Sequence, residues 1–332
     1  MTDFDYDLFI NRLFAKSEKS GVPLGGTFEL TSRCTLSCKM CYIHSAECEK
    51  SEKSTEWWLN IAQQAKESGT LLLLLTGGEP LLRKDFEEIY LACLKMGFLI
   101  SINTNATLID SEKVRFFAEN PVAAIKGLKE AGVPVKLNFS MTALNAHDAE
   151  AVQALAKEWG LPIQPVSYMF SSAQSCSERV YLSPEEAAKE HFLWQKRLMG
   201  EKDFAKYIDF NFRKKPVTLP GNKINCRAGS TTFWITADGK MLPCGMFKEP
   251  SVPVESFGEA WECIRREREK IYLPSACANC KRKSICDICA AVSYSETGKF
   301  DGLPSYACQK AIEYTKLCDG FIESVQGGES DK

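Results

Sequence analysis

The cysteines of this chain constrain its fold and chemistry more than any other feature of the sequence. The chain has 332 residues, of which 15 are cysteines, and they are spread unevenly. The first group lies near the start and consists of Cys34, Cys38 and Cys41. The second group lies in the last third and consists of Cys226, Cys244, Cys277, Cys280, Cys286, Cys289 and Cys308. Between Cys48 and Cys226 the sequence holds only Cys93 and Cys176. This distribution predicts two units, an N-terminal domain with one site and a C-terminal domain built around metal.

Composition and charge favour metal ligation over disulfide bonding. The 41 basic and 43 acidic residues give a net charge of −2, so no field of one sign indicates a nucleic-acid or membrane-surface partner. The longest apolar run, Leu71–Leu75, is far shorter than the roughly 20 residues that span a bilayer. The N-terminal sequence lacks the pattern of a signal peptide. We therefore expect a cytoplasmic protein, in which clustered cysteines more often bind metal than form disulfides.

Short apolar runs alternate with amphipathic stretches from residue 24 onward. Strands are expected at residues 26–31, 70–76, 98–104, 133–142 and 161–170, and helices at residues 55–69, 84–97 and 147–159. Alternation at this spacing predicts an α/β fold with strand–helix units in a parallel sheet or barrel. An amphipathic helix is expected before residue 20, and the polar tail after Gly327 is expected to be disordered.

The alternation fails once, between residues 111 and 132. Here the sequence predicts a helix, then Asn120-Pro121, then a second helix, with no strand between them. A right-handed parallel repeat needs a strand at this point. Either the chain lacks one strand–helix unit near residue 120, or a segment is missing there.

The first cysteine group has the spacing C-x3-C-x2-C on the loop after the first expected strand. Three thiolates this close can ligate three irons of a [4Fe–4S] cluster and leave the fourth iron open to another ligand. The alternative is a zinc site, but zinc normally takes four ligands and no partner has the usual spacing.

This spacing resembles that of the radical S-adenosylmethionine (SAM) enzymes. The resemblance extends to Tyr42, directly after the third cysteine, and to Gly77-Gly78-Glu79-Pro80 at the end of the second expected strand. It implies a partial (β/α)6 barrel of the TIM type. It also implies that the open iron binds SAM, and that the reduced cluster cleaves SAM to a 5′-deoxyadenosyl radical, which abstracts hydrogen from a substrate.

The Gly-Gly-Glu-Pro turn also has a physical rationale as a cofactor site. Two glycines allow close approach of the backbone to a ligand, and Glu79 can accept hydrogen bonds from the SAM ammonium group. Asn103, Thr104 and Asn105 end the third expected strand, where Asn103 and Asn105 either line the same site or form a turn. The family's ribose contact comes from the fourth strand, which is the one not found here, so no ribose-binding residue is assigned.

The second cysteine group resembles the SPASM extension of radical SAM enzymes. A zinc ribbon is disfavoured, because its two pairs usually stand roughly 15–20 residues apart, whereas Cys280 and Cys286 are close together. The resemblance implies two auxiliary [4Fe–4S] clusters, one held by Cys277, Cys280, Cys286 and Cys308 and the other by Cys226, Cys244 and Cys289. The fourth position of the second cluster is open, filled by Cys176 or filled by another ligand. The chain departs from the family in having two residues, not three, between Cys286 and Cys289.

The sequence therefore predicts four regions: an N-terminal helical extension (1–23), a radical SAM partial barrel (24–215), a small SPASM domain (216–320) and a flexible tail (321–332). Within the SPASM domain, the residues around Asp238-Gly239 predict a β-hairpin.

Most SPASM enzymes modify peptide or protein side chains, and this is the first functional hypothesis, with a flavodoxin- or ferredoxin-type electron donor. Only 33 residues precede Cys34, so we expect direct substrate binding or a separate peptide-recognition protein. Gly245 stands where sulfatase-maturating relatives carry an acid, which counts against that subgroup. The alternatives are a radical SAM enzyme acting on a small molecule and a catalytically impaired iron–sulfur scaffold. No catalytic base can be named from the sequence.

Overall fold

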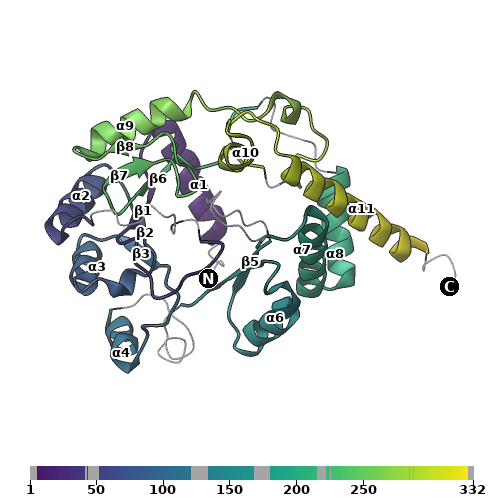
Figure 1. Cartoon of the computed structure of the whole chain (residues 1–332), viewed down its shortest axis with the longest axis horizontal. Helices are drawn as coiled ribbons and strands as arrows, with labels where there is room; N and C mark the ends of the chain where they lie inside the picture. The colour runs from purple at the N-terminus through teal and green to yellow at the C-terminus, as the bar shows by residue number, and fades with distance from the viewer. Residues whose placement is uncertain are drawn as a thin grey trace. The chain divides into compact units, whose positions relative to one another are not determined.

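The structure is a computed structural model that describes residues 6–41, 43, 52–120, 134–167, 180–214, 222–224, 226–283, 285–286 and 288–327 (Figure 1). The chain forms two compact units, each described here by itself. The first contains Met1–Val135 and Cys226–Lys270, and the second contains Lys136–Asn225 and Ile271–Lys332. None of the described helices is both long enough and apolar enough to cross a membrane.

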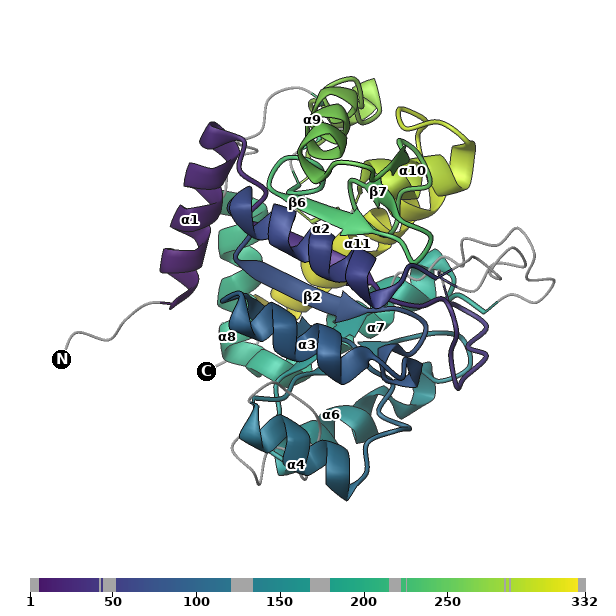
Figure 2. The ribbon, with the colours of Figure 1, turned by 90° about the vertical axis from the view of Figure 1, so that its left-hand side faces the viewer.

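The first unit is built on a six-stranded mixed sheet with the order β3-β2-β1-β6-β7-β8. Its strands are β1 (Gly25–Glu29), β2 (Leu72–Thr76), β3 (Leu99–Ile102), β6 (Thr232–Ile235), β7 (Lys240–Leu242) and β8 (Val252–Pro253). The helices are α1 (Tyr6–Ser20), α2 (Thr55–Glu67), α3 (Phe86–Lys95), α4 (Ser111–Glu119) and α9 (Phe257–Arg268), with the 3-10 turn η1 (Pro80–Leu82). The pairs β3–β2, β2–β1 and β1–β6 are parallel, and Figure 2 shows α2 and α3 lying across one face of the sheet. The predicted α/β class is thus confirmed.

The local sequence explains why these elements begin and end where they do. The hydroxyl of Ser54 caps α2 by accepting a hydrogen bond from the Trp57 amide. The helix ends before Gly69, whose φ of +96° lies in the region that favours glycine. The apolar residues of α2 then face the sheet, where the ring of Trp58 lies 4.9 Å from that of Phe28 on β1. The core of this unit is therefore a layer of side chains between the sheet and α2, α3 and α9.

The hairpin expected around Asp238-Gly239 is present, and it extends the N-terminal sheet. Strands β6 and β7 pair antiparallel, and Gly239 has a φ of +82° in the turn between them. Strand β6 also pairs parallel with β1, with Thr27 opposite Trp234. The compact units therefore do not coincide with the predicted domains, since each joins residues before 216 to residues after it. The predicted domain limits themselves stay a prediction.

The second unit contains a two-stranded parallel sheet and a group of packed helices. Its elements are β4 (Leu137–Ser140), β5 (Ile163–Val166), α6 (Ala149–Glu158), α7 (Pro184–Met199), α8 (Glu201–Ile208), α10 (Ala290–Thr297) and α11 (Ser305–Gly327), with the short 3-10 helices η2 (Ala146–Asp148) and η4 (Ser275–Cys277) and the π-helix η3 (Asp209–Lys214). Helices α7, α8 and α11 share a core in which the Phe204 ring lies 5.2 Å from Phe192 and 5.5 Å from Phe321.

The irregularity predicted near residue 120 coincides with a change of sheet. Helix α4 is present as predicted, whereas the expected second helix and residues 121–133 lie outside the described residues. Among the residues that are described, no strand lies between β3 and β4, and β4 pairs with β5 rather than with β3. The partial barrel and its missing strand stay predictions.

We expect Gly26→Ala to lower the free energy of unfolding by about 1–3 kcal/mol, because overpacking in a well-packed core costs that much. A Cβ on Gly26 would overlap the Cζ of the buried Phe233 ring. Urea denaturation measures the change. Gly258→Ala is the matched control, since a Cβ at this exposed position of α9 meets nothing within 4 Å. The control should be neutral or slightly stabilising, and equal effects of the two changes would contradict the expectation.

Candidate functional site

The candidate site lies where three neighbouring parallel strands end. The residues after β1 lead to Cys34, those after β2 are Gly77–Pro80, and those after β3 are Asn103–Asn105. Because β1, β2 and β3 are adjacent and parallel, these three segments leave the same edge of the sheet. Active sites of parallel α/β folds form at this edge.

Backbone hydrogen bonds continue the pairing of β1 and β2 into the site. The amide of Gly78 donates to the carbonyl of Thr31 at 2.8 Å, and that of Glu79 donates to the carbonyl of Arg33 at 2.8 Å. A Cβ on Gly77 would overlap the Thr31 oxygen, and one on Gly78 would overlap the Arg33 oxygen. The two glycines were expected to let the backbone approach a ligand; here they let it approach the chain that leads to Cys34.

Glu79 is fully buried and joins the ends of β2 and β3. Its carboxylate accepts hydrogen bonds from the Leu81 amide at 3.0 Å and from the Asn105 amide at 2.8 Å. The Thr104 hydroxyl lies within 2.9 Å of both carboxylate oxygens. These donors come close to the acceptor capacity of a carboxylate. Glu79 therefore fixes the turn after β2 to the residues after β3, and its contact with SAM stays a prediction.

Asn105 connects the end of β3 to the first cysteine. Its Nδ2 donates to the Cys34 Sγ at 3.4 Å and to the Thr35 Oγ1 at 3.0 Å. Asn103 continues the sheet, with its amide donating to the Leu75 carbonyl at 3.0 Å. Asn105 thus contacts the predicted cluster loop directly, whereas cofactor binding by both asparagines stays a prediction.

The three cysteines of the first group lie close enough to influence one another. Cys34 and Cys41 are half-buried and Cys38 is exposed, and the Cys41 amide donates to the Cys38 carbonyl at 3.1 Å. Burial, followed by the charges of Cys41 and Cys34, raises the pKa of the Cys38 thiol. Tyr42, like Cys48 and Cys176, lies outside the described residues.

A [4Fe–4S] cluster fits the chemistry of this donor set, because the irons of such clusters are held by cysteine thiolates. In the part of the chain that the structure describes, no group of three His, Cys, Asp or Glu side chains is arranged around one metal ion. A cluster presents a separate iron to each thiolate, so its ligands need not converge on one point. No cysteine among the described residues forms a disulfide. Three neighbouring thiols without disulfides therefore fit a cluster.

Three cysteines of the second unit also lie near one another. Burial, followed by the charges of Cys308 and Cys280, raises the pKa of the Cys277 thiol. Burial and the charges of Cys280 and Glu296 raise that of Cys308. The Cys286 thiol lies 3.9 Å from the carbonyl oxygen of Ala307. The proximity of Cys277, Cys280 and Cys308 is what the predicted first auxiliary set requires.

The second predicted auxiliary set is divided between the two compact units. Exposed Cys226 and half-buried Cys244 belong to the first unit. Cys289 belongs to the second, where its sulfur caps α10 by accepting from the Val292 amide at 3.4 Å. This ligand set stays a prediction.

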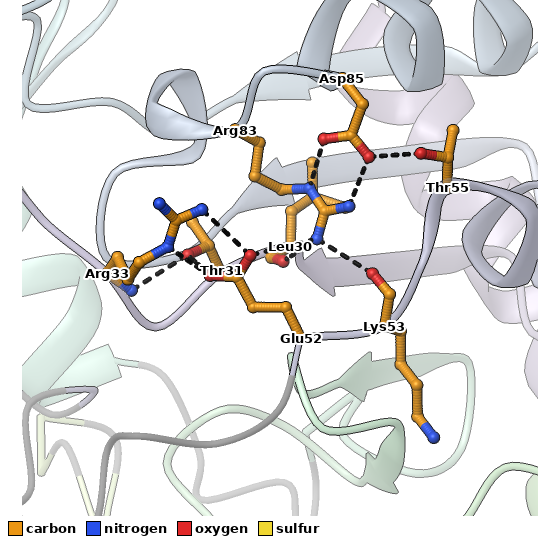
Figure 3. A network of polar contacts seen from close by, with 8 residues as sticks. All are labelled: Leu30, Thr31, Arg33, Glu52, Lys53, Thr55, Arg83 and Asp85. Carbon is orange, nitrogen blue, oxygen red and sulfur yellow. Dashed lines mark hydrogen bonds and ion pairs between the residues drawn. The ribbon is translucent and has the colours of Figure 1, made fainter.

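The sequence analysis missed a network of charged residues beside the cysteine loop (Figure 3). Arg83, whose side chain is 5% exposed, donates two hydrogen bonds to Asp85, of 2.9 and 2.5 Å. Glu52 accepts from Arg33 at 2.7 and 3.1 Å and from the Thr31 hydroxyl. The signal in the sequence was the Arg-x-Asp pair of Arg83 and Asp85, which begins three residues after Pro80.

The charges of this network hold both carboxyl groups ionised. Burial raises the pKa of Asp85, but hydrogen bonds from Arg83 and Thr55 and the charge of Arg83 outweigh it, so its pKa lies below the ordinary value. Burial likewise raises the pKa of Glu52, and Arg33, Thr31 and Arg83 together lower it below the ordinary value. Both carboxylates are thus stabilised by the fold in their charged form.

Comparison with known proteins agrees with this site. Residues 28–146 match the model of the Radical SAM superfamily. An AdoMet-dependent heme synthase of Methanosarcina barkeri is 24% identical over 82% of this chain and 93% of its own length. A PqqA peptide cyclase of Granulibacter bethesdensis is 24% identical over 84% of this chain and 85% of its own length.

Two solved structures share the fold at low sequence identity. Streptococcus suis SuiB bound to precursor peptide SuiA matches with a TM-score of 0.64 and 18% identity, over 93% of this chain and 82% of SuiB. Native anSMEcpe with bound AdoMet and Kp18Cys peptide matches with a TM-score of 0.67 and 18% identity, over 92% of this chain and 99% of that one.

These matches, together with the α/β fold, define an enzyme. The superfamily match covers β1 to the start of the second unit, so this part of the chain is a radical SAM domain. A domain of this superfamily implies a [4Fe–4S] cluster and SAM as cofactors.

We expect Thr104→Val to lower the free energy of unfolding by about 1–3 kcal/mol, because it leaves the buried Glu79 carboxylate without one donor. Denaturation of the metal-free protein in urea measures this change. Thr107→Val is the control, since its hydroxyl is exposed. A loss no larger than that of the control would contradict the role given to Thr104.

Acid should weaken the fold through Asp85. The pKa of Asp85 is lower in the folded than in the unfolded chain. Its contribution to the free energy of unfolding is therefore complete above the ordinary pKa of about 3.9, and it is lost as the pH falls through the pKa of the folded state. We expect the free energy of unfolding to fall less steeply from about pH 5 downward in Asp85→Asn than in the wild type. Identical slopes in the two proteins would contradict this expectation.

Proposed function

We propose that this radical SAM enzyme modifies a side chain of a peptide or protein substrate. The observation that carries the proposal is the shared strand edge, where the chain that leads to Cys34, Cys38 and Cys41 pairs with the turn that contains buried Glu79. The relatives named PqqA peptide cyclase and the peptide-bound structures of SuiB and anSMEcpe support a peptide as the substrate class.

In this proposal the thiolates of Cys34, Cys38 and Cys41 hold the catalytic cluster. Once bound, the cluster supplies the electron for reductive cleavage of SAM. Asn105 orients Cys34 through its hydrogen bond to the sulfur, and Glu79 holds the residues after β3 against the turn after β2. Tyr42, Gly77, Gly78, Pro80 and Asn103 complete the proposed cofactor site.

The proposal includes a SPASM domain at residues 216–320 with two auxiliary [4Fe–4S] clusters. The proximity of Cys277, Cys280 and Cys308 supports the first of these clusters. The proposal also includes the partial barrel, a flavodoxin- or ferredoxin-type electron donor and a cytoplasmic location. The peptide is either bound directly or delivered by a separate recognition protein.

A small-molecule substrate is the second candidate. It is favoured by the AdoMet-dependent heme synthase, which is similar to this chain over 93% of its own length, and by an Fe-coproporphyrin III synthase of the same organism. Both names indicate tetrapyrrole chemistry in those proteins. Substrate turnover distinguishes this candidate from the first.

Anaerobic reconstitution tests the clusters. Three clusters of four irons each give about 12 irons per chain. We expect the triple variant of Cys34, Cys38 and Cys41 to alanine to lose about 4 irons and all SAM cleavage, while retaining auxiliary iron. Cys263→Ala, at an isolated cysteine in α9, is the control and should retain both. Fewer than about 8 irons in the wild type would contradict the three-cluster assignment.

Mass spectrometry tests the substrate class. The chain is co-expressed with short peptides encoded beside its gene, and a new cross-link or an oxidised side chain should lower the peptide mass by two hydrogens. Reaction only with a small molecule such as an iron porphyrin precursor, with every peptide unmodified, would replace the peptide by the second candidate.

A further inference from the structure

One buried arginine bonds the backbone on both sides of the cysteine segment, defined here as residues 31–52. The Nη1 of Arg83 donates to the Leu30 carbonyl at 2.9 Å and to the Lys53 carbonyl at 3.2 Å (Figure 3). Leu30 directly precedes the segment and Lys53 directly follows it. We propose that Arg83 is a positioning residue that holds the two flanks of the cysteine segment together before iron binds. This inference rests on the proposed function, in which the segment carries the catalytic cluster.

The guanidinium group of Arg83 is held in place by contacts other than those with the two carbonyls. Its Nε and Nη2 donate to the two oxygens of Asp85 at 2.9 and 2.5 Å, which is a two-point geometry that sets the plane of the group. Asp85 is in turn fixed by the Thr55 hydroxyl at 2.6 Å. With 5% of its side chain exposed, Arg83 exchanges these bonds little with water. Nη1 is therefore aimed at the flanks of the segment by the residues that begin α2 and α3.

Glu52 supplies a second connection between the same flanks. It stands at the end of the cysteine segment, and its carboxylate accepts from the Arg33 side chain and the Thr31 hydroxyl at the beginning. Its Oε2 also lies 3.7 Å from the Nη1 of Arg83. The contacts of Glu52 join the same two flanks as those of Arg83, since Thr31 follows Leu30 and Glu52 precedes Lys53.

Joining the flanks lowers the entropic cost of binding a cluster. Three thiols on an unrestrained chain lose conformational freedom when they take up one cluster, and part of that loss is the closure of the loop that bears them. If the ends of the loop are already held, the entropy of loop closure has been lost during folding and is not lost again when the cluster binds. The bound state is therefore favoured by preorganisation. Without Arg83, the protein should fold around β1 and β2 but hold the cluster less tightly.

Iron retention tests the role of Arg83 directly. The reconstituted full chain is exposed to an excess of the iron chelator bathophenanthroline disulfonate. The cluster with the open iron is then followed in the reduced protein by electron paramagnetic resonance, because SAM binding changes the spectrum of that cluster. We expect Arg83→Gln to lose this SAM-responsive signal about tenfold faster than the wild type, the effect of one hydrogen bond to a charged group. Arg83→Lys should recover part of the retention, because an ammonium group keeps the charge but not the planar geometry.

Two further variants separate positioning from general destabilisation. Glu52→Gln removes the charge of Glu52 and so weakens the second connection, while leaving Arg83 and Asp85 paired, and it should speed loss of the same signal several-fold. Lys113→Gln removes a comparable cation, the partner of Glu87 on α3, and should match the wild type. The auxiliary iron should be released at the wild-type rate in all of these proteins.

Each result decides for or against the inference. Equal retention in the wild type, Arg83→Gln and Glu52→Gln would overturn it, as would equal acceleration of SAM-responsive and auxiliary iron loss with a lowered unfolding midpoint. Both outcomes leave the proposed function standing, because the wild type still shows the SAM-responsive cluster. A wild type without that cluster would overturn the proposed function and this inference together.

Discussion

The candidate site depends on the parallel pairing of β1 and β2, which continues beyond the ends of both strands. Amide groups of Gly78 and Glu79 bond to the carbonyls of Thr31 and Arg33, so the chain is still held as a sheet one residue before Cys34. This pairing needs two residues without side chains, and Gly77 and Gly78 meet that need. Backbone hydrogen bonds thus fix the position of the chain just before Cys34, the first of the predicted cluster ligands, without any contribution from a side chain or a metal.

Much of the first unit follows from local sequence patterns. The leucine run at residues 71–75 predicts a buried strand, and β2 forms there because adjacent parallel strands and helices cover it. The helices α2 and α3 follow from apolar residues at helical spacing, and Gly69 and Gly97 close them. The cysteine and glycine motifs could be found in the sequence because the residues of each motif act together and must stand at a fixed, short spacing along the chain.

What the sequence could not reveal depends on residues that meet only in the folded chain. Nothing in the residues of β6 indicates that they pair with β1, since a strand pattern does not specify its neighbour. Arg83 is an ordinary charged residue until β1, α2 and α3 bring Leu30, Lys53 and Asp85 around it. Glu79 was singled out for a ligand, whereas two of the residues that donate to it, Thr104 and Asn105, come from another strand end, and nothing in the sequence pairs them with Glu79.

The pairing of β1 with β6 also sets an order of events during synthesis. The Glu29 carboxylate accepts a hydrogen bond from the Trp234 indole across 205 residues of sequence. Until β6 leaves the ribosome, one edge of β1 lacks its native neighbour, although β1, β2 and β3 have all been made. Such long-range pairing slows folding and leaves a strand edge open to wrong partners. The half of the sheet that carries the first cysteines therefore lacks its native neighbour β6 until the hairpin has been made, and the sheet around this edge is completed only late in translation.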